Sequence, residues 1–134
     1  MVAVYVLECA DGCYYVGKTG RSVRVRMAEH VSGRLRGCAW TRIHRPLRVI
    51  RVVENAAPLD EDRVTKETMW EFGVNYVRGG SYTAVELPCH QALALRDEMC
   101  TADDRCLRCQ RRGHFARDCL DVGCRPNKRA RTDN

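Results

Sequence analysis

Three cysteines and one histidine near the C-terminal end have the types and spacing of metal ligands. They are Cys106, Cys109, His114 and Cys119, in the pattern C-x2-C-x4-H-x4-C. Thiolates and a neutral imidazole at such short separations wrap one Zn²⁺ ion tetrahedrally. Gly113 supplies a tight turn directly before the histidine, and a segment this small requires its metal to fold. Four protein ligands leave no open coordination position, so we predict a structural zinc and not a catalytic one.

This segment resembles the zinc knuckles of retroviral type over its full length. Such knuckles bind single-stranded nucleic acid by stacking a base on an aromatic side chain, while flanking cations follow the phosphate backbone. Phe115 is the predicted stacking platform. The predicted phosphate contacts are the arginines of the same segment, namely Arg108, Arg111, Arg112 and Arg117. Taken one at a time, each arginine is equally compatible with an ordinary solvated charge.

Tyrosine, arginine and histidine form a second pattern in the N-terminal part of the chain. In order, the motifs are Val4-Tyr5-Val6-Leu7, Tyr15-Val16-Gly17-Lys18-Thr19 and Arg26-x-x-x-His30, followed by Trp40-Thr41 and Pro46. Their order and spacing resemble the signature of the GIY-YIG endonucleases. The first motif reads Ala3-Val4-Tyr5 and lacks the glycine for which the family is named, but it keeps the tyrosine that carries the chemistry.

The resemblance implies a small α/β (α+β) domain, with a three-stranded antiparallel sheet flanked by helices, and phosphodiester hydrolysis assisted by one divalent metal. In that chemistry Tyr5 would act as a general base towards the attacking water or position it. Tyr15 would orient the water or the scissile phosphate. Arg26 would neutralise charge on the phosphoryl oxygens, and His30, one helical turn along, would hydrogen-bond to the phosphate or to a tyrosine.

A carboxylate that holds Mg²⁺ or Mn²⁺ completes the implied site, because these hard cations prefer oxygen ligands. Glu61 is the predicted ligand, with Glu67 as the alternative and Asp62 adjacent. Six residues turn a helix through about 600°, so Glu61 and Glu67 cannot both face one site. Lys18 and His44 are weaker candidates for contacts with the nucleic-acid backbone.

The register of a predicted hairpin decides whether the two tyrosines share a face. A two-residue turn on Asp11-Gly12 would place Tyr5 and Tyr15 on opposite faces. A three-residue loop with Gly12 in the left-handed conformation instead pairs Leu7 with Tyr15 and places both tyrosines on one face. We predict the three-residue loop.

The remaining elements follow from apolar patterning and turn residues. The sequence predicts a helix from Ser22 to about Val31, a third strand over 47–53 and a helix over 59–72, followed by a turn-rich loop over 77–81 and a helix after Pro88. We therefore expect a GIY-YIG-like domain over 1–100, a linker over 101–105, the zinc knuckle over 106–119 and a basic, disordered tail over 120–134.

Charge and cysteine usage limit the classes of partner. The net charge is +6, and nine arginines face a single acid, Glu29, between Arg21 and Arg51, which favours nucleic acid as the partner. No apolar run approaches the ~20 residues of a bilayer span, so no membrane association is expected. Nine cysteines with no signal peptide ahead of them predict an intracellular protein, nuclear or cytoplasmic. The sequence identifies no protein partner.

Three functions compete on these observations. The first is a metal-dependent endonuclease that hydrolyses phosphodiester bonds in DNA or RNA, with the knuckle binding single strands. The second is a nucleic-acid-binding module that keeps the GIY-YIG fold without cleavage. The third is a nucleocapsid-like or chaperone protein. The joint presence of Tyr5, Tyr15, Arg26 and a nearby carboxylate favours the endonuclease.

Overall fold

The computed structural model describes residues 1–32 and 39–120, and the predicted basic tail lies outside them except for Leu120. The chain divides into two compact units, Met1–Cys89 and His90–Asn134. The predicted domain ranges, with a first domain ending at residue 100, stay a prediction. Within the described ranges, no helix is both long enough and apolar enough to span a membrane.

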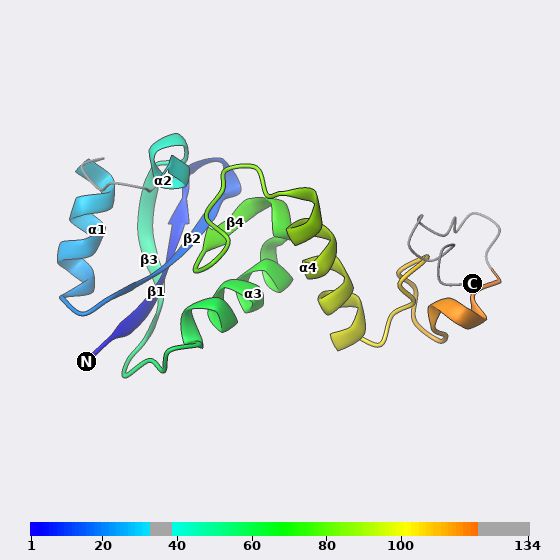
Figure 1. The fold of residues 1–134 in the computed structure, drawn as a ribbon. Coiled ribbons are helices and arrows are strands. Elements are labelled where there is room, and N and C mark those ends of the chain that lie inside the picture. Colours follow the sequence, from blue (N-terminus) through cyan, green and yellow to red (C-terminus); the bar gives the residue numbers. More distant parts are fainter. Residues whose placement is uncertain (33–38, 121–134) are drawn as a thin grey trace. The chain divides into compact units, whose positions relative to one another are not determined.

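A four-stranded mixed sheet forms the centre of the first unit (Figure 1). Its order is β3-β1-β2-β4, with the bounds Ala3–Cys9 for β1, Tyr14–Thr19 for β2, Pro46–Val53 for β3 and Val77–Gly79 for β4. β1 pairs antiparallel with β2 and β3, as predicted, whereas β4 runs parallel to β2. The α/β class is confirmed, but the sheet has one strand more than expected.

Glycine explains why β4 forms where the sequence predicts a loop. Gly79 has φ +154°, and a Cβ built there would lie 2.2 Å from the carbonyl oxygen of Val16. A strand can approach β2 this closely only without a side chain at that position. Gly79 therefore serves strand pairing, whereas Gly80 and Ser81 form a turn directly after the strand, as predicted.

The β1–β2 hairpin has the predicted three-residue loop. Leu7 is opposite Tyr15 and Tyr5 is opposite Gly17, so the two tyrosines lie on one face of the sheet. Gly12 is left-handed at φ +69°, as expected, and Asp11 is left-handed as well at φ +64°. A loop of this length and conformation is what sets both phenol rings on the same side.

Helices cover both faces of this sheet (Figure 1). α1, Val23–Ser32, and α2, Ala39–Ile43, lie on the tyrosine-bearing face, where Trp40 packs with Tyr5 and Leu7. α2 lies between the predicted helix and the predicted third strand, where no helix was predicted, and its Trp40 donates Nε1–H to the carbonyl of Tyr14 at 2.9 Å. α3, Asp60–Phe72, covers the opposite face, where the rings of Phe72 and Tyr14 stack at 3.8 Å.

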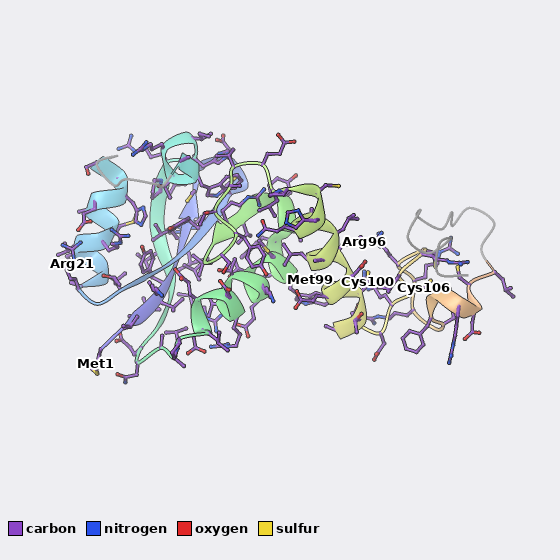
Figure 2. The ribbon with its side chains drawn as sticks, in the orientation of Figure 1. Met1, Arg21, Arg96, Met99, Cys100 and Cys106 are labelled. Atoms are coloured by element: carbon purple, nitrogen blue, oxygen red, sulfur yellow. The ribbon has the colours of Figure 1, made fainter. Side chains whose placement is uncertain are left out.

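The second unit begins at His90, the second residue of α4, Cys89–Ala102, and this helix continues into the segment predicted as a linker. Arg96 on α4 donates to the carbonyl of Leu107 at 3.2 Å, and Asp103 accepts from both Arg105 and Arg112. Figure 2 shows Arg96 on the helix and Cys106 in the segment that follows. These contacts tie the end of α4 to the start of the cysteine-rich segment.

Candidate active site and metal cluster

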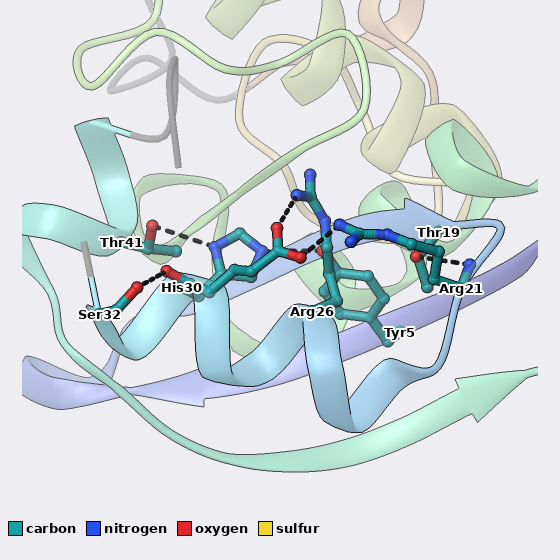
Figure 3. A network of polar contacts seen from close by, with 8 residues as sticks. Tyr5, Thr19, Arg21, Arg26, His30, Ser32 and Thr41 are labelled. Atoms are coloured by element: carbon teal, nitrogen blue, oxygen red, sulfur yellow. Dashed lines mark hydrogen bonds and ion pairs between the residues drawn. The ribbon is translucent and has the colours of Figure 1, made fainter. Parts of the chain in front are cut away.

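A hydrogen bond between Tyr5 and His30 forms the centre of the first cluster (Figure 3). The Tyr5 hydroxyl lies 2.8 Å from His30 Nε2, and His30 Nδ1 lies 3.4 Å from Thr41 Oγ1. Tyr5 is 0% exposed and His30 is 2% exposed. Each ring nitrogen of His30 faces a hydroxyl, which can donate or accept, so the ring orientation is fixed in either tautomer.

Burial makes this histidine neutral at physiological pH. It lowers the pKa of His30 from 6.5 to about 4, with a further contribution from the positive charge of Arg26. A neutral imidazole carries one N–H and one bare nitrogen. When the proton is on Nδ1, that N–H donates to Thr41 and Nε2 accepts from the Tyr5 hydroxyl.

Arg26 and Tyr15 complete the cluster around this pair. The Arg26 guanidinium hydrogen-bonds to Tyr5 and to Glu29, and although burial lowers the pKa of Arg26, these two partners outweigh it and raise the pKa overall. The Tyr15 and His30 ring centroids lie 5.1 Å apart. The structure therefore brings Tyr5, Tyr15, Arg26 and His30 together.

Gly17 makes room for the phenol of Tyr5. A Cβ built at Gly17 would lie 2.5 Å from the Tyr5 hydroxyl oxygen and 3.0 Å from Cε2 of Tyr15. The glycine of the second motif is therefore required by the packing of the two tyrosines and not by a turn.

Glu61 belongs to a different local arrangement. Its Oε1 lies 3.9 Å from Nζ of Lys18, which pairs with Val4 in the register and therefore starts from the face opposite Tyr5. Burial raises the pKa of Glu61, while Lys18 opposes the rise. Both side chains line a cavity of about 240 Å³ with Val2, Val4, Ala56, Ala57 and Pro58.

The other two candidate acids on α3, Glu67 and Asp62, already have partners. Glu67 forms ion pairs with Arg51 and Arg63, both at 3.0 Å. Asp62 accepts from the amide of Ser81 at 2.8 Å and from its hydroxyl at 2.7 Å. Glu61 thus fits a hard cation best among the three, because its ion pair with Lys18 is long and a single carboxylate suits Mg²⁺, which keeps several waters.

Two further polar residues lie near the hairpin loop and Trp40. Nδ1 of His44, a predicted backbone contact, is 3.0 Å from Oδ2 of Asp11 at the hairpin loop. Arg78 has no role predicted from its sequence, yet its side chain is buried and lies 4.7 Å over the Trp40 ring. Its guanidinium donates to four carbonyls, those of Val74, Val77, Ala84 and Val85. The sequence does hold one signal for this role of Arg78, which lies between Val77 and two glycines. Tightly turned backbone exposes carbonyls that a guanidinium can bind.

The four predicted zinc ligands form one cluster in the second unit. Their ligand atoms all lie within 4.8 Å of one another, and Cys109 Sγ is 3.4 Å from His114 Nε2. Tetrahedral bonds of about 2.3 Å to sulfur and 2.0 Å to nitrogen place such atoms roughly 3.5 Å apart. The amide of Arg108 also donates to Cys106 Sγ at 3.3 Å, a contact that stabilises a thiolate. The cluster could therefore hold a zinc ion.

The predicted nucleic-acid contacts of this segment have different surroundings. Phe115 is 55% exposed, as a stacking platform requires. Arg112 is paired with Asp103, and Arg117 lies 3.8 Å from Asp118. Gly113 has φ +104°, in agreement with the predicted turn before His114.

Comparison with known proteins supports the N-terminal pattern. The family model of the GIY-YIG catalytic domain matches residues 1–62. The N-terminal residues match a GIY-YIG catalytic domain. This GIY-YIG match contains Tyr5, Tyr15, Arg26, His30 and Glu61, whose individual roles stay predictions.

The alignments with curated relatives cover only a short region. The chain is 47% identical over 47 residues to a UPF0213 protein of Streptococcus pneumoniae strain R6, and equally to the UPF0213 protein of S. pneumoniae serotype 4. The aligned part is 35% of this chain and 44% of each relative, so the match spans less than half the length of the relatives. No solved structure matches this chain.

Proposed function

We propose that this protein is a metal-dependent endonuclease that hydrolyses phosphodiester bonds in DNA or RNA. The single observation that carries the proposal is the buried Tyr5–His30 hydrogen bond beside Arg26, within a region that matches the GIY-YIG catalytic domain. A phenol, a neutral imidazole and a guanidinium in contact provide a proton path next to a site for an anion.

The proposed reaction assigns a step to each of these groups. A water molecule attacks phosphorus and passes its proton to the Tyr5 oxygen, while the Tyr5 proton moves to Nε2 of His30 in the tautomer protonated at Nδ1. A new P–O bond forms, and the scissile P–O bond breaks with its electron pair on the leaving oxygen, which takes a proton from solvent. His30 then returns its extra proton to solvent by way of Tyr5. Arg26 neutralises the charge on the phosphoryl oxygens, and the anionic phosphate raises the low pKa of His30 so that it can take up the proton.

Glu61 is the residue proposed to hold Mg²⁺ or Mn²⁺. A divalent cation held by Glu61 would supply Lewis-acid polarisation of a phosphodiester bound beside it and would stabilise the leaving oxygen. The partly buried carboxylate and its long contact with Lys18 support this role, since a cation can replace the ammonium group. Lys18 is then free to contact the nucleic-acid backbone.

We propose that the C-terminal cluster holds a structural Zn²⁺ and presents a single-strand binding surface. The exposed Phe115 would stack on a base, and the neighbouring arginines would follow the phosphates. Because all four ligands are protein groups, this ion takes no part in hydrolysis.

Cleavage assays with matched variants test the enzyme proposal. Labelled branched, flapped, duplex and single-stranded substrates are incubated with Mg²⁺ or Mn²⁺ and with wild type, Arg26→Ala or Glu61→Gln. We expect wild type to cut at least one substrate and both variants to lose about 100-fold or more, because each removes a group that acts on transition-state charge.

Two neighbouring substitutions serve as controls. Arg24→Ala removes an exposed arginine from the same helix as Arg26, and Glu67→Gln removes an ion-paired acid from the same helix as Glu61. Both are expected to cleave like wild type. Intact substrates with every protein would overturn the proposal, and loss of activity in Glu67→Gln but not Glu61→Gln would overturn the metal assignment.

A non-catalytic binding module is the second candidate, and one observation favours it. Tyr5 has no solvent exposure, so a water reaches its hydroxyl only if neighbouring side chains move. A binding module predicts that nucleic acid is bound but left intact with either metal, and that Tyr5→Phe binds as tightly as wild type. Cleavage by wild type that Tyr5→Phe loses excludes this candidate.

A further inference from the structure

Glu29 bridges two arginines that come from different segments. Its Oε2 lies 3.1 Å from Nη1 of Arg26 on α1, and its Oε1 pairs with Nη2 of Arg21, which precedes the helix (Figure 3). One carboxylate therefore offers each of its oxygens to a separate guanidinium. Although burial raises the pKa of Glu29, these two partners outweigh it and hold the pKa below its usual range.

This arrangement has the geometry with which two guanidinium groups bind a phosphodiester. A phosphodiester also presents two anionic oxygens, and the planar guanidinium group matches phosphate as well as carboxylate. Glu29 is the one acid among the nine arginines between Arg21 and Arg51. The carboxylate thus occupies a position that suits a phosphate group.

The bridge is exposed enough to be replaced. The side chain of Arg21 is 61% exposed and that of Glu29 is 26% exposed. Exposed ion pairs contribute little to stability and are screened by salt, whereas a nucleic-acid phosphate brings its own charge and releases condensed counterions. Exchange of the carboxylate for a phosphate therefore costs little folding energy.

Arg21 is also held in place for such a contact. Its amide donates to Oγ1 of Thr19 at 3.0 Å, and Thr19 is buried at the end of β2. Arg26 joins the pair to the Tyr5 hydroxyl. An anion between the two guanidinium groups would therefore lie next to the proposed reacting groups.

We propose that Arg21 and Arg26 form a two-arginine clamp for a nucleic-acid phosphate, and that Glu29 occupies this clamp until nucleic acid displaces it. Arg21 is then a substrate-binding residue, and Glu29 is an internal competitor that weakens binding. The inference rests on the proposed function for the identity of the ligand, but binding alone can test it.

Binding of a fluorescent oligonucleotide to the full-length, zinc-loaded protein tests the clamp, with no Mg²⁺ or Mn²⁺ added. We expect Arg21→Ala to weaken binding about 5- to 10-fold and to reduce the salt slope for duplex DNA by roughly 0.9. Glu29→Gln should tighten binding about 3-fold. In the Glu29→Gln background, Arg21→Ala should still weaken binding.

Two variants control for net charge alone. Arg24→Ala removes an exposed positive charge from the same helix, and Glu8→Gln removes an acid that pairs with Arg48 elsewhere. Each must have a smaller effect than its counterpart. The clamp is overturned if Arg21→Ala binds like Arg24→Ala, or if Glu29→Gln binds no tighter than Glu8→Gln, which would mean that Glu29 only orients Arg26.

Failure of the clamp and failure of the enzyme proposal give different results. If wild type cleaves and Arg21→Ala cleaves equally well at low substrate concentration, the clamp fails and the enzyme stands. If no metal supports cleavage but the binding series holds, the clamp stands as part of a binding module.

Discussion

The Tyr5 cluster and the Cys/His cluster are assembled from very different lengths of chain. The four candidate zinc ligands come from one short segment, Cys106 to Cys119, and their ligand atoms lie within 4.8 Å of one another. The other cluster takes Tyr5 from β1, Tyr15 from β2 and His30 from α1, and brings them together only when the sheet and the helix pack.

The two clusters therefore depend on different sources of free energy. A segment as short as residues 106–119 has little apolar surface to bury, so we expect its order to come from metal–ligand bonds. The Tyr5 cluster is held by burial and hydrogen bonds within a core that includes Leu7 and Trp40. Removal of zinc should therefore disrupt the Cys/His cluster alone, and small changes in packing should disrupt the Tyr5 cluster alone.

Removal of zinc is the change with the largest expected effect. Structural zinc contributes about 10 to 16 kcal/mol in small zinc-finger peptides, so Cys106→Ser or chelation should unfold residues 106–119. The Met1–Cys89 unit should keep its structure, since its core contains none of the four ligands. Amide NMR spectra of the loaded and metal-free protein measure both effects residue by residue.

Cys89→Ser is the matched control, because Cys89 is an exposed thiol outside the ligand set. It should bind one equivalent of zinc like wild type. Unchanged amide shifts around His114 after chelation would show that the knuckle folds without metal, and would remove the contrast between the two clusters.

Gly17→Ala should disturb the other cluster with a smaller but still large effect. The added methyl group would lie 2.5 Å from the Tyr5 hydroxyl and must push the phenol away from His30. Overpacking of this kind costs about 1 to 3 kcal/mol of unfolding free energy. Denaturant unfolding measures the cost, and cleavage assays should show at least a 10-fold loss of activity.

Gly20→Ala provides the comparison, because the nearest atom to a Cβ there is 4.0 Å away. Its unfolding free energy should stay within about 0.5 kcal/mol of wild type. Equal stability and activity of the two alanine variants would contradict the packing of Tyr5 over Gly17, and with it the proposed proton path.

The features that could be predicted from the sequence are the local ones, and those that were missed depend on contacts between distant segments. The zinc spacing is local, so the ligand set could be read directly from Cys106 to Cys119. The hairpin register was also local, because loop length alone decides whether Leu7 pairs with Tyr15. β4 was missed because its pairing with β2 depends on a glycine approaching Val16, which sequence spacing does not encode.

The partners of the charged residues were the least predictable part. Glu29 is a lone acid in a basic stretch of sequence, but its bridge between Arg21 and Arg26 depends on side-chain direction at the start of α1. The position of an acid on α3 likewise does not decide whether its side chain points towards the tyrosines. In the structure, Glu61 contacts Lys18. Charge pairing of this kind is set by tertiary packing and not by sequence periodicity.

Acidification should weaken the Tyr5 cluster through His30. The unfolded chain binds a proton at His30 below about pH 6.5, whereas burial keeps the folded pKa near 4. Lower pH therefore favours the unfolded state over this range, by at most roughly 3 kcal/mol, and the loss is complete near pH 4. Unfolding free energies of wild type and His30→Gln from pH 4 to 7.5 measure it.

The difference between these two proteins isolates His30, because every other titrating group is shared. The difference in unfolding free energy between wild type and His30→Gln should narrow as the pH falls, since the glutamine side chain binds no proton in either state. If the unfolding free energies of the two proteins instead change in parallel from pH 7.5 to 4, the pKa of His30 is the same in the folded and unfolded states. That result would contradict the neutral imidazole on which the proposed proton path depends.

Thr41→Val is the change with the smallest expected effect, and it tests which ring nitrogen of His30 carries the proton. Valine keeps the buried volume but leaves His30 Nδ1 without the hydroxyl at 3.4 Å, which should cost about 1 to 2 kcal/mol. The neutral ring then gains by moving its proton to Nε2, where it donates to Tyr5. Imidazole ¹⁵N shifts should therefore change from the Nδ1–H tautomer in wild type to the Nε2–H tautomer in Thr41→Val, and cleavage should fall with them because Nε2 can no longer accept the Tyr5 proton. A tautomer that is the same in both proteins would leave Thr41 with a packing role alone.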